Sequence, residues 1–387
     1  MSAETPIRPA QPTLAALFVL LAFSHTVLAG SRVAVSLDAL HRGASPALVG
    51  ALVALFSLLP MLAAMPAGRL IDRVGSAPPL WTGTVSIAAG AVLPALWPGL
   101  AALVAAAPLI GLGFMLTQVA VQHAVAGLGA PQDRTAQFGL LSLGSSIANF
   151  AGPLVAGLAI DAAGHRVAFV VLALLPVVPF GLLLAARRLA LREGRARPPE
   201  APHERMWDLL RDRTLRRLFL VNAFVAIGWD VHNVFLPIYG ISLGLSASQI
   251  GMILASFAAA SFVVRFAIGA IARRWREPVI LRWVFASAAL CYLVLPWVAS
   301  PWALMALAFT MGMGLGAGQP VVMSLLQLHA PPQRLAEAAG IRIALIQSMA
   351  FSVPLVFGAL GTSIGVAAVF WAAAACLGAA GAVSRRR

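Results

Sequence analysis

Apolar stretches of about 20 residues alternate with short polar segments along almost the whole chain. A helix of about 20 apolar residues is long enough to cross the ~30 Å hydrocarbon core of a bilayer. The pattern therefore predicts an all-α membrane protein with twelve transmembrane helices. The expected spans are 13–36, 46–68, 78–97, 100–125, 135–160, 167–188, 216–240, 247–271, 278–298, 301–327, 340–361 and 363–383.

The composition supports a chain that lies in lipid. Of the 387 residues, 60% are hydrophobic and only 10% are charged, whereas a soluble domain carries about 25% charged residues. A net charge of +14 could indicate a nucleic-acid partner, but the arginines gather in every second loop. We therefore expect the lipid bilayer, and no nucleic acid, as a partner. The two cysteines, Cys291 and Cys376, lie far apart in apolar runs, so we expect no metal site.

The distribution of arginine predicts the orientation of the chain. If the N-terminus is cytosolic, only Arg32, Arg42 and Arg166 fall on the outer side, and Arg265 lies inside a span. The other arginines then all fall in cytosolic segments, as the positive-inside rule requires. We therefore expect a multi-pass protein of the cytoplasmic (inner) membrane with both termini in the cytosol.

The second half of the chain repeats the first at a fixed offset of 201 residues. The repeat pairs Gly43, Ser45, Gly50, Gly68, Gln118, Gly139, Pro153, Gly157 and Gly164 with Gly244, Ser246, Gly251, Gly269, Gln319, Gly340, Pro354, Gly358 and Gly365. It predicts two pseudo-symmetric six-helix bundles. The expected segments are a cytosolic tail (1–12), an N-terminal bundle (13–188), a cytosolic linker (189–215), a C-terminal bundle (216–383) and a second tail (384–387).

A short polar hairpin follows the second span, and it reads Pro-Ala-Gly-Arg-Leu-Ile-Asp-Arg-Val-Gly over residues 66–75. Major facilitator superfamily transporters carry the pattern Gly-x-Leu-x-Asp-Arg-x-Gly between their second and third helices. The matching residues are Gly68, Leu70, Asp72, Arg73 and Gly75. With the internal repeat, the chain resembles this superfamily over nearly its whole length, and in particular its exporter-like bacterial members.

The resemblance implies a gating role for this hairpin. In the family, its acid locks the two halves together on the cytosolic side. The gating motif would comprise Gly68, Arg69, Asp72, Arg73 and Gly75. In this lock Glu337 could pair with Arg69 or Arg73, and Asp72 could pair with Arg134 or Arg342. The alternative is a solvated turn that only obeys the positive-inside rule.

The fifth span carries a helix-packing motif formed by Gly144, Gly152, Pro153 and Gly157. It resembles the Gly-Pro motif in helix five of facilitator-family exporters, which implies a bend that seals one side and favours export. Ordinary close packing of helices is the alternative. Many proton-coupled exporters carry an arginine where this chain has Ala107, so the resemblance leaves the coupling ion open.

Ionisable groups at membrane depth are costly and are therefore functional candidates. Asp230 lies well inside the seventh span, where it could exchange a proton, bind a cation or form a structural ion pair. Arg32 lies in the outer part of the first span. We expect it to pair with Asp230 in an outer gate, and the alternative is that it extends to lipid headgroups.

Further polar candidates for substrate binding or coupling are His25, Gln118, Gln319, His232 and Asn233. The two glutamines are a symmetric pair on helices four and ten, which line the cavity in the family. His25 has packing as its alternative role, and the glutamines have interhelical hydrogen bonding. Arg265 is expected to extend to the cytosolic surface or to pair locally. A cavity with few charges would favour a neutral, amphipathic or cationic substrate over a strongly anionic one.

These features predict a secondary active transporter that moves a small solute by alternating access. Protons are a candidate coupling ion, export is favoured, and we expect a monomer without a cofactor. An uptake permease of the same fold and a non-transporting sensor or scaffold are the alternatives. The sequence has no Gly-x-x-x-x-Gly-Lys-Ser/Thr loop for ATP. Its spans also lack the clustered nucleophile and base that an enzyme needs.

Overall fold

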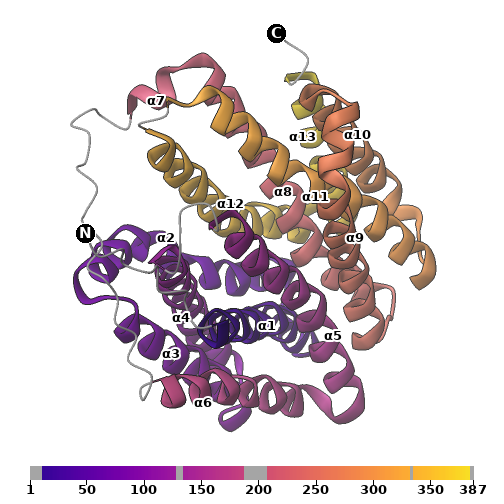
Figure 1. Cartoon of the computed structure of the whole chain (residues 1–387). Coiled ribbons are helices and arrows are strands. Elements are labelled where there is room, and N and C mark those ends of the chain that lie inside the picture. The colour runs from indigo at the N-terminus through magenta and orange to yellow at the C-terminus, as the bar shows by residue number, and fades with distance from the viewer. Residues whose placement is uncertain (1–10, 128–133, 187–206, 332–333, 384–387) are drawn as a thin grey trace, which may run out of the picture.

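The computed structural model describes residues 11–127, 134–186, 207–331 and 334–383, and almost all of them are helical (Figure 1). The helices of the first half are α1 (Gln11–His41), α2 (Pro46–Val74), α3 (Ala77–Leu96), α4 (Leu100–Gly127), α5 (Arg134–Leu174) and α6 (Val177–Ala186). The second half contains α7 (Trp207–Arg211), α8 (Arg213–Ser242), α9 (Ala247–Arg274), α10 (Glu277–Val294), α11 (Pro301–His329), α12 (Leu335–Ile364) and α13 (Val366–Val383). The predicted tails and most of the predicted linker lie outside the described residues.

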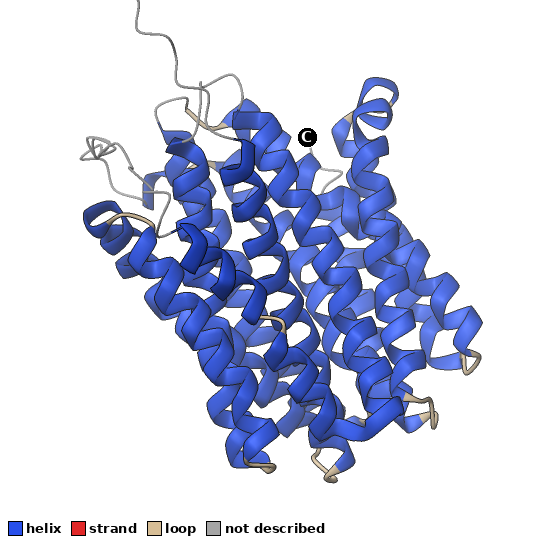
Figure 2. Cartoon of the chain, turned by 60° about the horizontal axis from the view of Figure 1, so that its bottom comes forward, coloured by secondary structure: helices blue, strands red, loops and turns tan. Residues whose placement is uncertain are grey.

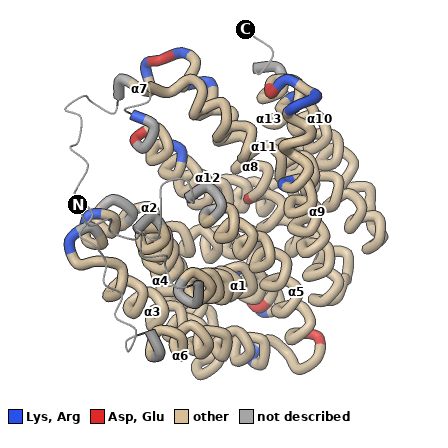
Figure 3. The backbone as a smooth tube through the Cα atoms, viewed as in Figure 1, with Lys and Arg blue, Asp and Glu red and all other residues tan. Residues whose placement is uncertain are grey.

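Ten helical stretches of the described chain are long and apolar enough to cross a membrane. One of them, Gly139–Leu184, is interrupted at Gly164, and Val366–Gly381 is a shorter apolar helix. This arrangement reproduces the twelve predicted spans and confirms the all-α membrane fold. Figure 3 shows arginines and acids mostly at the ends of the helices, with few along their middles.

The two ends of the helical bundle differ in the segments that they hold. We call the end where α1 begins and α13 finishes the terminal end, and the opposite end the loop end. Short turns join α1 to α2, α8 to α9 and α12 to α13 at the loop end, and Figure 2 shows such turns together at the bottom of the bundle. The chain therefore crosses the bundle up and down in both halves.

The turns at the loop end follow the internal repeat. Gly164 has φ 83° and ψ 171°, and its counterpart Gly365 has φ 94° and ψ 159°. Only glycine populates this region of backbone conformation readily. Gly43 and Gly244, with φ 79° and 73°, form the second symmetric pair. The repeat in the sequence thus corresponds to a repeat in backbone geometry.

The two halves meet at the loop end along two symmetric seams. On one seam, α5 packs against α9 so closely that a methyl group on Gly251 would lie 2.6 Å from the Pro153 carbonyl oxygen. On the other seam, α12 packs against α2, and a methyl group on Gly358 would lie 3.0 Å from the Pro46 carbonyl oxygen. Glycine permits this backbone contact because it has no side chain. The loop end is therefore packed shut.

Each seam also has a hydrogen bond that caps a helix of the opposite half. The carboxylate of Asp161 accepts the backbone N–H groups of Ala247 (3.0 Å) and Ser248 (2.8 Å) at the start of α9. At the symmetric place, Thr362 Oγ1 accepts the N–H of Ala47 (2.9 Å) at the start of α2. The first N–H groups of a helix have no partner within the helix. Because these side chains accept hydrogen bonds from such N–H groups of the opposite half, they hold the two halves together.

At the terminal end the same four helices lie apart. Symmetric glycines occur there on α2, α9, α5 and α12: Gly68, Gly269, Gly139 and Gly340. A methyl group added at any of these glycines would meet nothing within 4 Å. The halves are thus packed at the loop end and splayed at the terminal end.

The cap at Asp161 leads to a prediction about the seam. Replacing Asp161 with Ala is expected to destabilise the closed loop end by about 1 kcal/mol, because an uncapped helix start loses about that much. The equilibrium would shift roughly fivefold toward an open loop end. The shift can be measured as the distance distribution between spin labels at Ala162→Cys and Ser242→Cys in a background without native cysteines.

The matched control for this prediction is Thr362→Val on the symmetric seam. It removes one neutral hydrogen bond, whereas Asp161 contributes two bonds and a negative charge at a helix start. Negative charge is favourable at that position. The shift should therefore be smaller for Thr362→Val, and an equal or larger shift would contradict this account of the seam.

Candidate functional site

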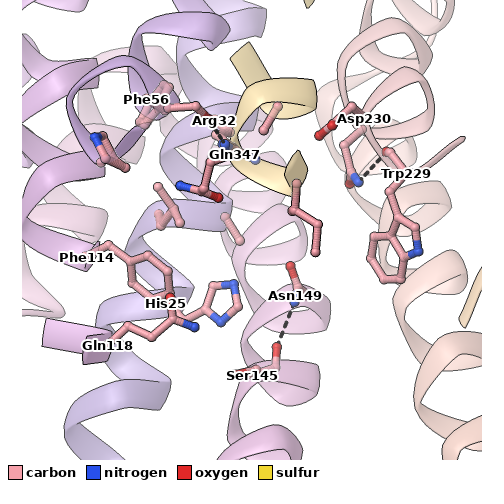
Figure 4. A pocket seen from close by; sticks show the side chains of 18 of the residues that line it. His25, Arg32, Phe56, Phe114, Gln118, Ser145, Asn149, Trp229, Asp230 and Gln347 are labelled. Carbon is pink, nitrogen blue, oxygen red and sulfur yellow. Dashed lines mark hydrogen bonds between the residues drawn. The ribbon is translucent and has the colours of Figure 1, made fainter. Parts of the chain in front are cut away.

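A cavity of about 580 Å³ lies between the two halves (Figure 4). Its lining residues come from α1, α2, α4 and α5 of the first half and from α8, α9, α11 and α12 of the second. Because the seams close the loop end and the halves splay at the terminal end, the cavity faces the terminal end. Such a volume is in the range of small-molecule sites.

Arg32 on α1 and Asp230 on α8 both line this cavity, as predicted (Figure 4). Arg32 donates from Nη2 to Ser57 Oγ at 3.1 Å, and its guanidinium lies 5.8 Å from the centre of the Phe56 ring. Its buried Nε has no hydrogen-bond partner. Both contacts are within the first half. The predicted ion pair with Asp230 is therefore not formed in this conformation.

The carboxylate of Asp230 faces the cavity without a partner. Among the described residues, it makes no hydrogen bond and no ion pair within 4.0 Å. Its neighbour Asn233 also lines the cavity and donates from Nδ2 to the Trp229 carbonyl at 2.8 Å. An unpaired carboxylate at membrane depth costs free energy, so its retention points to a role in function.

His25 and the two symmetric glutamines line the same cavity. The His25 ring lies 4.7 Å from the Phe114 ring, and its buried Nδ1 has no partner. Gln319 accepts a bond from Arg342 at 3.4 Å, whereas the Gln118 amide is without a protein partner among the described residues. The structure thus brings together residues that lie far apart in the sequence, and their roles in binding remain a prediction.

His232 is the one predicted binding candidate that the structure places away from the cavity. Its side chain is fully buried and stacks on Phe257, with ring centres 4.2 Å apart. Neither ring nitrogen has a partner. Residues two apart point to different sides of a helix, so His232 packs into the second half while Asp230 reaches the cavity. This corrects the prediction that His232 takes part in binding or coupling.

Two arginines that the sequence did not assign to the site also line the cavity. Arg265 on α9 donates across the seam to Ser146 Oγ (2.8 Å) and Ser142 Oγ (3.3 Å) on α5. Of the two expected arrangements, extension to the cytosolic surface and pairing with nearby groups, the structure shows pairing. The signal in the sequence was a single arginine inside an apolar run.

Arg342 on α12 donates to Asn222 Oδ1 at 3.1 Å and to Gln319 Oε1 at 3.4 Å. The sequence placed it at the cytosolic start of a helix and named it only as a candidate partner of Asp72 in the lock, so nothing marked it as a cavity residue. With Arg32 and Arg265 it gives the cavity three cations against the single carboxylate of Asp230. This corrects the expectation that the cavity holds few charges and disfavours a strongly anionic substrate.

The gating motif lies at the splayed terminal end. Helix α2 continues through most of it, to Val74, and stops at Gly75, which has φ 80°. Arg69 and Arg73 are exposed, and the side chain of Asp72 lies outside the described part of the structure. The expected tight turn is thus limited to the end of the motif, because the helix continues beyond the apolar stretch.

The predicted partner of this motif is engaged elsewhere. Glu337 accepts bonds from Arg334 at 2.8 Å and 3.0 Å, and it pairs with neither Arg69 nor Arg73 as we expected. The physical reason is that the halves lie apart at this end. The lock was predicted for the opposite conformation, and it stays a prediction for that state.

The helix-packing motif of α5 makes close contacts along its whole length. A methyl group on Gly144 would lie 2.9 Å from the Phe18 ring, and one on Gly152 would lie 2.7 Å from the backbone nitrogen of Gly30. Further along, Gly157 packs on the start of α9. The motif thus holds α5 against α1 and closes one seam at the loop end.

The sequence matches the family model of the Major Facilitator Superfamily over residues 14–217 and 218–386. The chain belongs to the major facilitator superfamily. It is therefore a secondary transporter that moves small molecules across a membrane, and it is not an enzyme. The two matched segments meet near the start of α8.

Relatives and solved structures agree with this family. The chain is 23% identical over 243 residues to YfkF of Bacillus subtilis (strain 168), named an uncharacterized MFS-type transporter. The aligned region covers 58% of this chain and 57% of that relative. A peptide transporter POT in complex with sulfate matches with TM-score 0.80 at 18% identity, covering 99% of this chain and 96% of the other.

Two further solved structures share the fold of this facilitator-family chain. A POT family transporter in complex with 5-aminolevulinic acid matches with TM-score 0.81 at 14% identity, covering 98% of this chain and 96% of the other. A bacterial homologue of the human lysosomal transporter Spinster, in an inward-facing and unoccupied conformation, matches with TM-score 0.77 at 14% identity, covering 97% of each chain. At these identities the likeness shows the fold alone.

Proposed function

We propose that this transporter exports a small solute in exchange for protons, with the cavity as the site whose access alternates. The observation that carries the proposal is the unpaired carboxylate of Asp230 in a cavity that both halves enclose. A group that must take and release a proton in each cycle needs a site that solvent can reach. Asp230 meets this requirement because it faces a cavity open toward the terminal end.

The proposed orientation has the terminal end in the cytosol. Arginines of the described chain gather at that end, for example Arg69, Arg73, Arg273 and Arg274, which agrees with the positive-inside rule. The cavity would then receive solute from the cytosol in the present conformation. Opening the two loop-end seams and closing the terminal end would release the solute outside.

Asp230 and Arg32 are the proposed coupling pair. In the present conformation Arg32 is held by Ser57 of its own half. An ionised Asp230 would attract Arg32 across the cavity, and a protonated Asp230 would not. Proton binding therefore changes an interaction between the halves, which is the link that coupled transport requires. Gln118 and Asn233 supply polar groups that a solute could contact.

An uptake permease is the second candidate, since the same cavity could carry solute inward. The close-packed motif at Gly152, Pro153 and Gly157 supports export, because the resemblance connects it with a sealed outer side. Its symmetric copy at Pro354 and Gly358 seals the second seam in the same way. The direction of gradient-driven flux distinguishes the two candidates.

The test is solute flux in proteoliposomes of known protein orientation. A panel of labelled anionic, neutral and cationic compounds would be followed with an imposed pH gradient and after its collapse by a protonophore. We expect at least one compound to accumulate against its gradient, in the export direction, only while the pH gradient persists. Flux that is the same with and without the pH gradient would reject proton coupling. Accumulation of solute in the opposite direction would reject export.

A further inference from the structure

A second cleft of about 660 Å³ lies beside the cavity. The two share the lining residues Ser142, Arg265, Gln319 and Arg342, so they adjoin each other at these side chains. The rest of the cleft lining is mostly apolar, and its apolar side chains are Leu140, Leu143, Phe262, Phe266, Ile268, Pro320 and Met323. A polar cavity and an apolar cleft thus meet at two arginines.

The cleft lies where α5 and α9 diverge. These helices are in close contact at the loop end, at Gly157 and Ala247, and they are apart at the terminal end, at Gly139 and Gly269. The cleft therefore opens sideways between the halves. Phe266 is 71% exposed and packs edge-on against Phe262 with ring centres 4.8 Å apart. Apolar side chains at this depth place the opening against lipid acyl chains.

The two arginines at the junction carry charge that their protein partners do not neutralise. Arg265 donates to two serine hydroxyls, and Arg342 donates to two side-chain amides. Neither guanidinium lies within 4.0 Å of a carboxylate among the described residues. Both side chains are half-buried, and a partly desolvated cation without an acidic partner is costly at membrane depth. An anion that enters from outside the protein would neutralise it.

The internal repeat shows that this charge is not a requirement of the fold. The positions that the repeat makes equivalent to Arg265 on α9 and Arg342 on α12 are Ala64 on α2 and Leu141 on α5. Both halves adopt the same fold, but only the second half carries a cation at these two positions. The two arginines are therefore a feature of the second half and not of the repeated fold.

We propose that the cleft between α5 and α9 binds an anionic amphipath, with its carboxylate or phosphate headgroup between Arg265 and Arg342 and its apolar tail in the cleft. The anionic amphipath would be the substrate class of the proposed transporter, so this inference rests on the proposed function. Guanidinium groups form bidentate, charge-assisted hydrogen bonds with both types of headgroup. The tail would enter from the lipid through the side of the bundle, and the headgroup would reach the polar cavity.

The first arm of the test measures equilibrium binding to the full chain in nanodiscs of zwitterionic phosphatidylcholine. The probes are octyl phosphate, inorganic phosphate and neutral octyl glucoside. We expect octyl phosphate to bind at least tenfold more tightly than either of the other two, since only it matches both the arginines and the cleft. Equal binding of inorganic phosphate and octyl phosphate would overturn the proposal of an amphipathic ligand, because it would show that the site binds an anion without using the apolar tail.

The second arm uses charge variants. Arg265→Gln and Arg342→Gln should each weaken octyl phosphate binding about tenfold, as expected for losing a charge-assisted bond. Arg265→Lys should retain part of the affinity. Arg282→Gln, at an exposed position on α10, is the matched control and should bind as the wild type does. Unchanged binding by folded Arg265→Gln and Arg342→Gln would overturn the proposal.

The third arm fills the cleft. Gly139 lines the cleft, and a Cβ atom at this position would meet nothing within 4 Å, so we expect the ring of Gly139→Trp to fill part of the cleft. It should abolish the preference for octyl phosphate over inorganic phosphate. The symmetric variant Gly340→Trp, at a position that does not line the cleft, is the matched control and should keep that preference. Loss of the preference in both variants, or in neither, would count against a tail site in this cleft.

Binding needs no flux, so the two proposals fail separately. If the protein binds octyl phosphate through both arginines but moves no solute, the proposed anion site stands and the proposed transport function is rejected. A chain that transports a compound from the panel but binds octyl phosphate independently of Arg265 and Arg342 would keep transport and reject the anion site.

Discussion

Replacement of Asp230 by Asn is expected to abolish accumulation of solute driven by a pH gradient. A gradient of 2 pH units provides about 1.36 kcal/mol per unit for each proton, which sustains roughly 100-fold accumulation at one proton per cycle. Asn has nearly the same shape as Asp but cannot exchange a proton. Accumulation should therefore fall from about 100-fold to about onefold, while exchange of solute across the membrane without a gradient continues.

This prediction has two controls that the structure provides. Asp38 is a buried carboxylate on α1 that pairs with Arg42 at 3.0 Å and does not line the cavity. Asp38→Asn should leave gradient-driven accumulation largely intact, provided that the variant folds. Asp230→Glu should keep coupling at a changed rate. Full accumulation of solute by Asp230→Asn would reject Asp230 as the coupling residue. If the variant lost both accumulation and gradient-free exchange, Asp230 would instead be assigned to substrate binding.

A disulfide across the second loop-end seam is expected to stop transport almost completely. The hydrogen bond of 2.9 Å between the Ala47 N–H and Thr362 Oγ1 brings the two backbones within disulfide range. In Ala47→Cys/Thr362→Cys, oxidation would tie α2 to α12 and prevent the loop end from opening. Alternating access requires that opening, so flux should disappear on oxidation and return when a reductant is added.

The cross-link experiment requires a background without reactive native thiols, in which Cys291 and Cys376 are replaced by Ala. The single variants Ala47→Cys and Thr362→Cys should transport equally well under oxidising and reducing conditions. Binding of solute should survive the cross-link, because the cavity stays open toward the terminal end. Normal flux through the fully cross-linked protein would contradict the proposed movement at this seam.

The sequence predicted the fold well because the bilayer restricts what a chain can do. Backbone groups in lipid must bond within the chain, so apolar stretches of about 20 residues become helices. The repeat then predicted which helices correspond, and symmetric turns at Gly164 and Gly365 confirm it. Even the close contacts of Gly50 and Gly251 follow the same offset.

The sequence predicted in part which polar residues share a cavity, and their roles stay predictions. Arg32, Asp230, His25 and the glutamine pair line one cavity, since each is a polar group in a span where polarity is costly. His232 satisfied the same criterion but points away from the cavity. Polarity alone marks a residue as unusual, and it does not show which face of a helix that residue occupies.

By itself, the sequence determined that this protein is a duplicated membrane bundle, because length, apolarity and the repeat are properties of the chain alone. The tertiary structure alone showed where the halves are closed and which charges share one space. Arg265 and Arg342 lie on different helices, and the sequence does not show that they are close, yet both line the junction of the cavity and the cleft. Such a junction depends on how two halves pack against each other, which no single stretch of residues encodes.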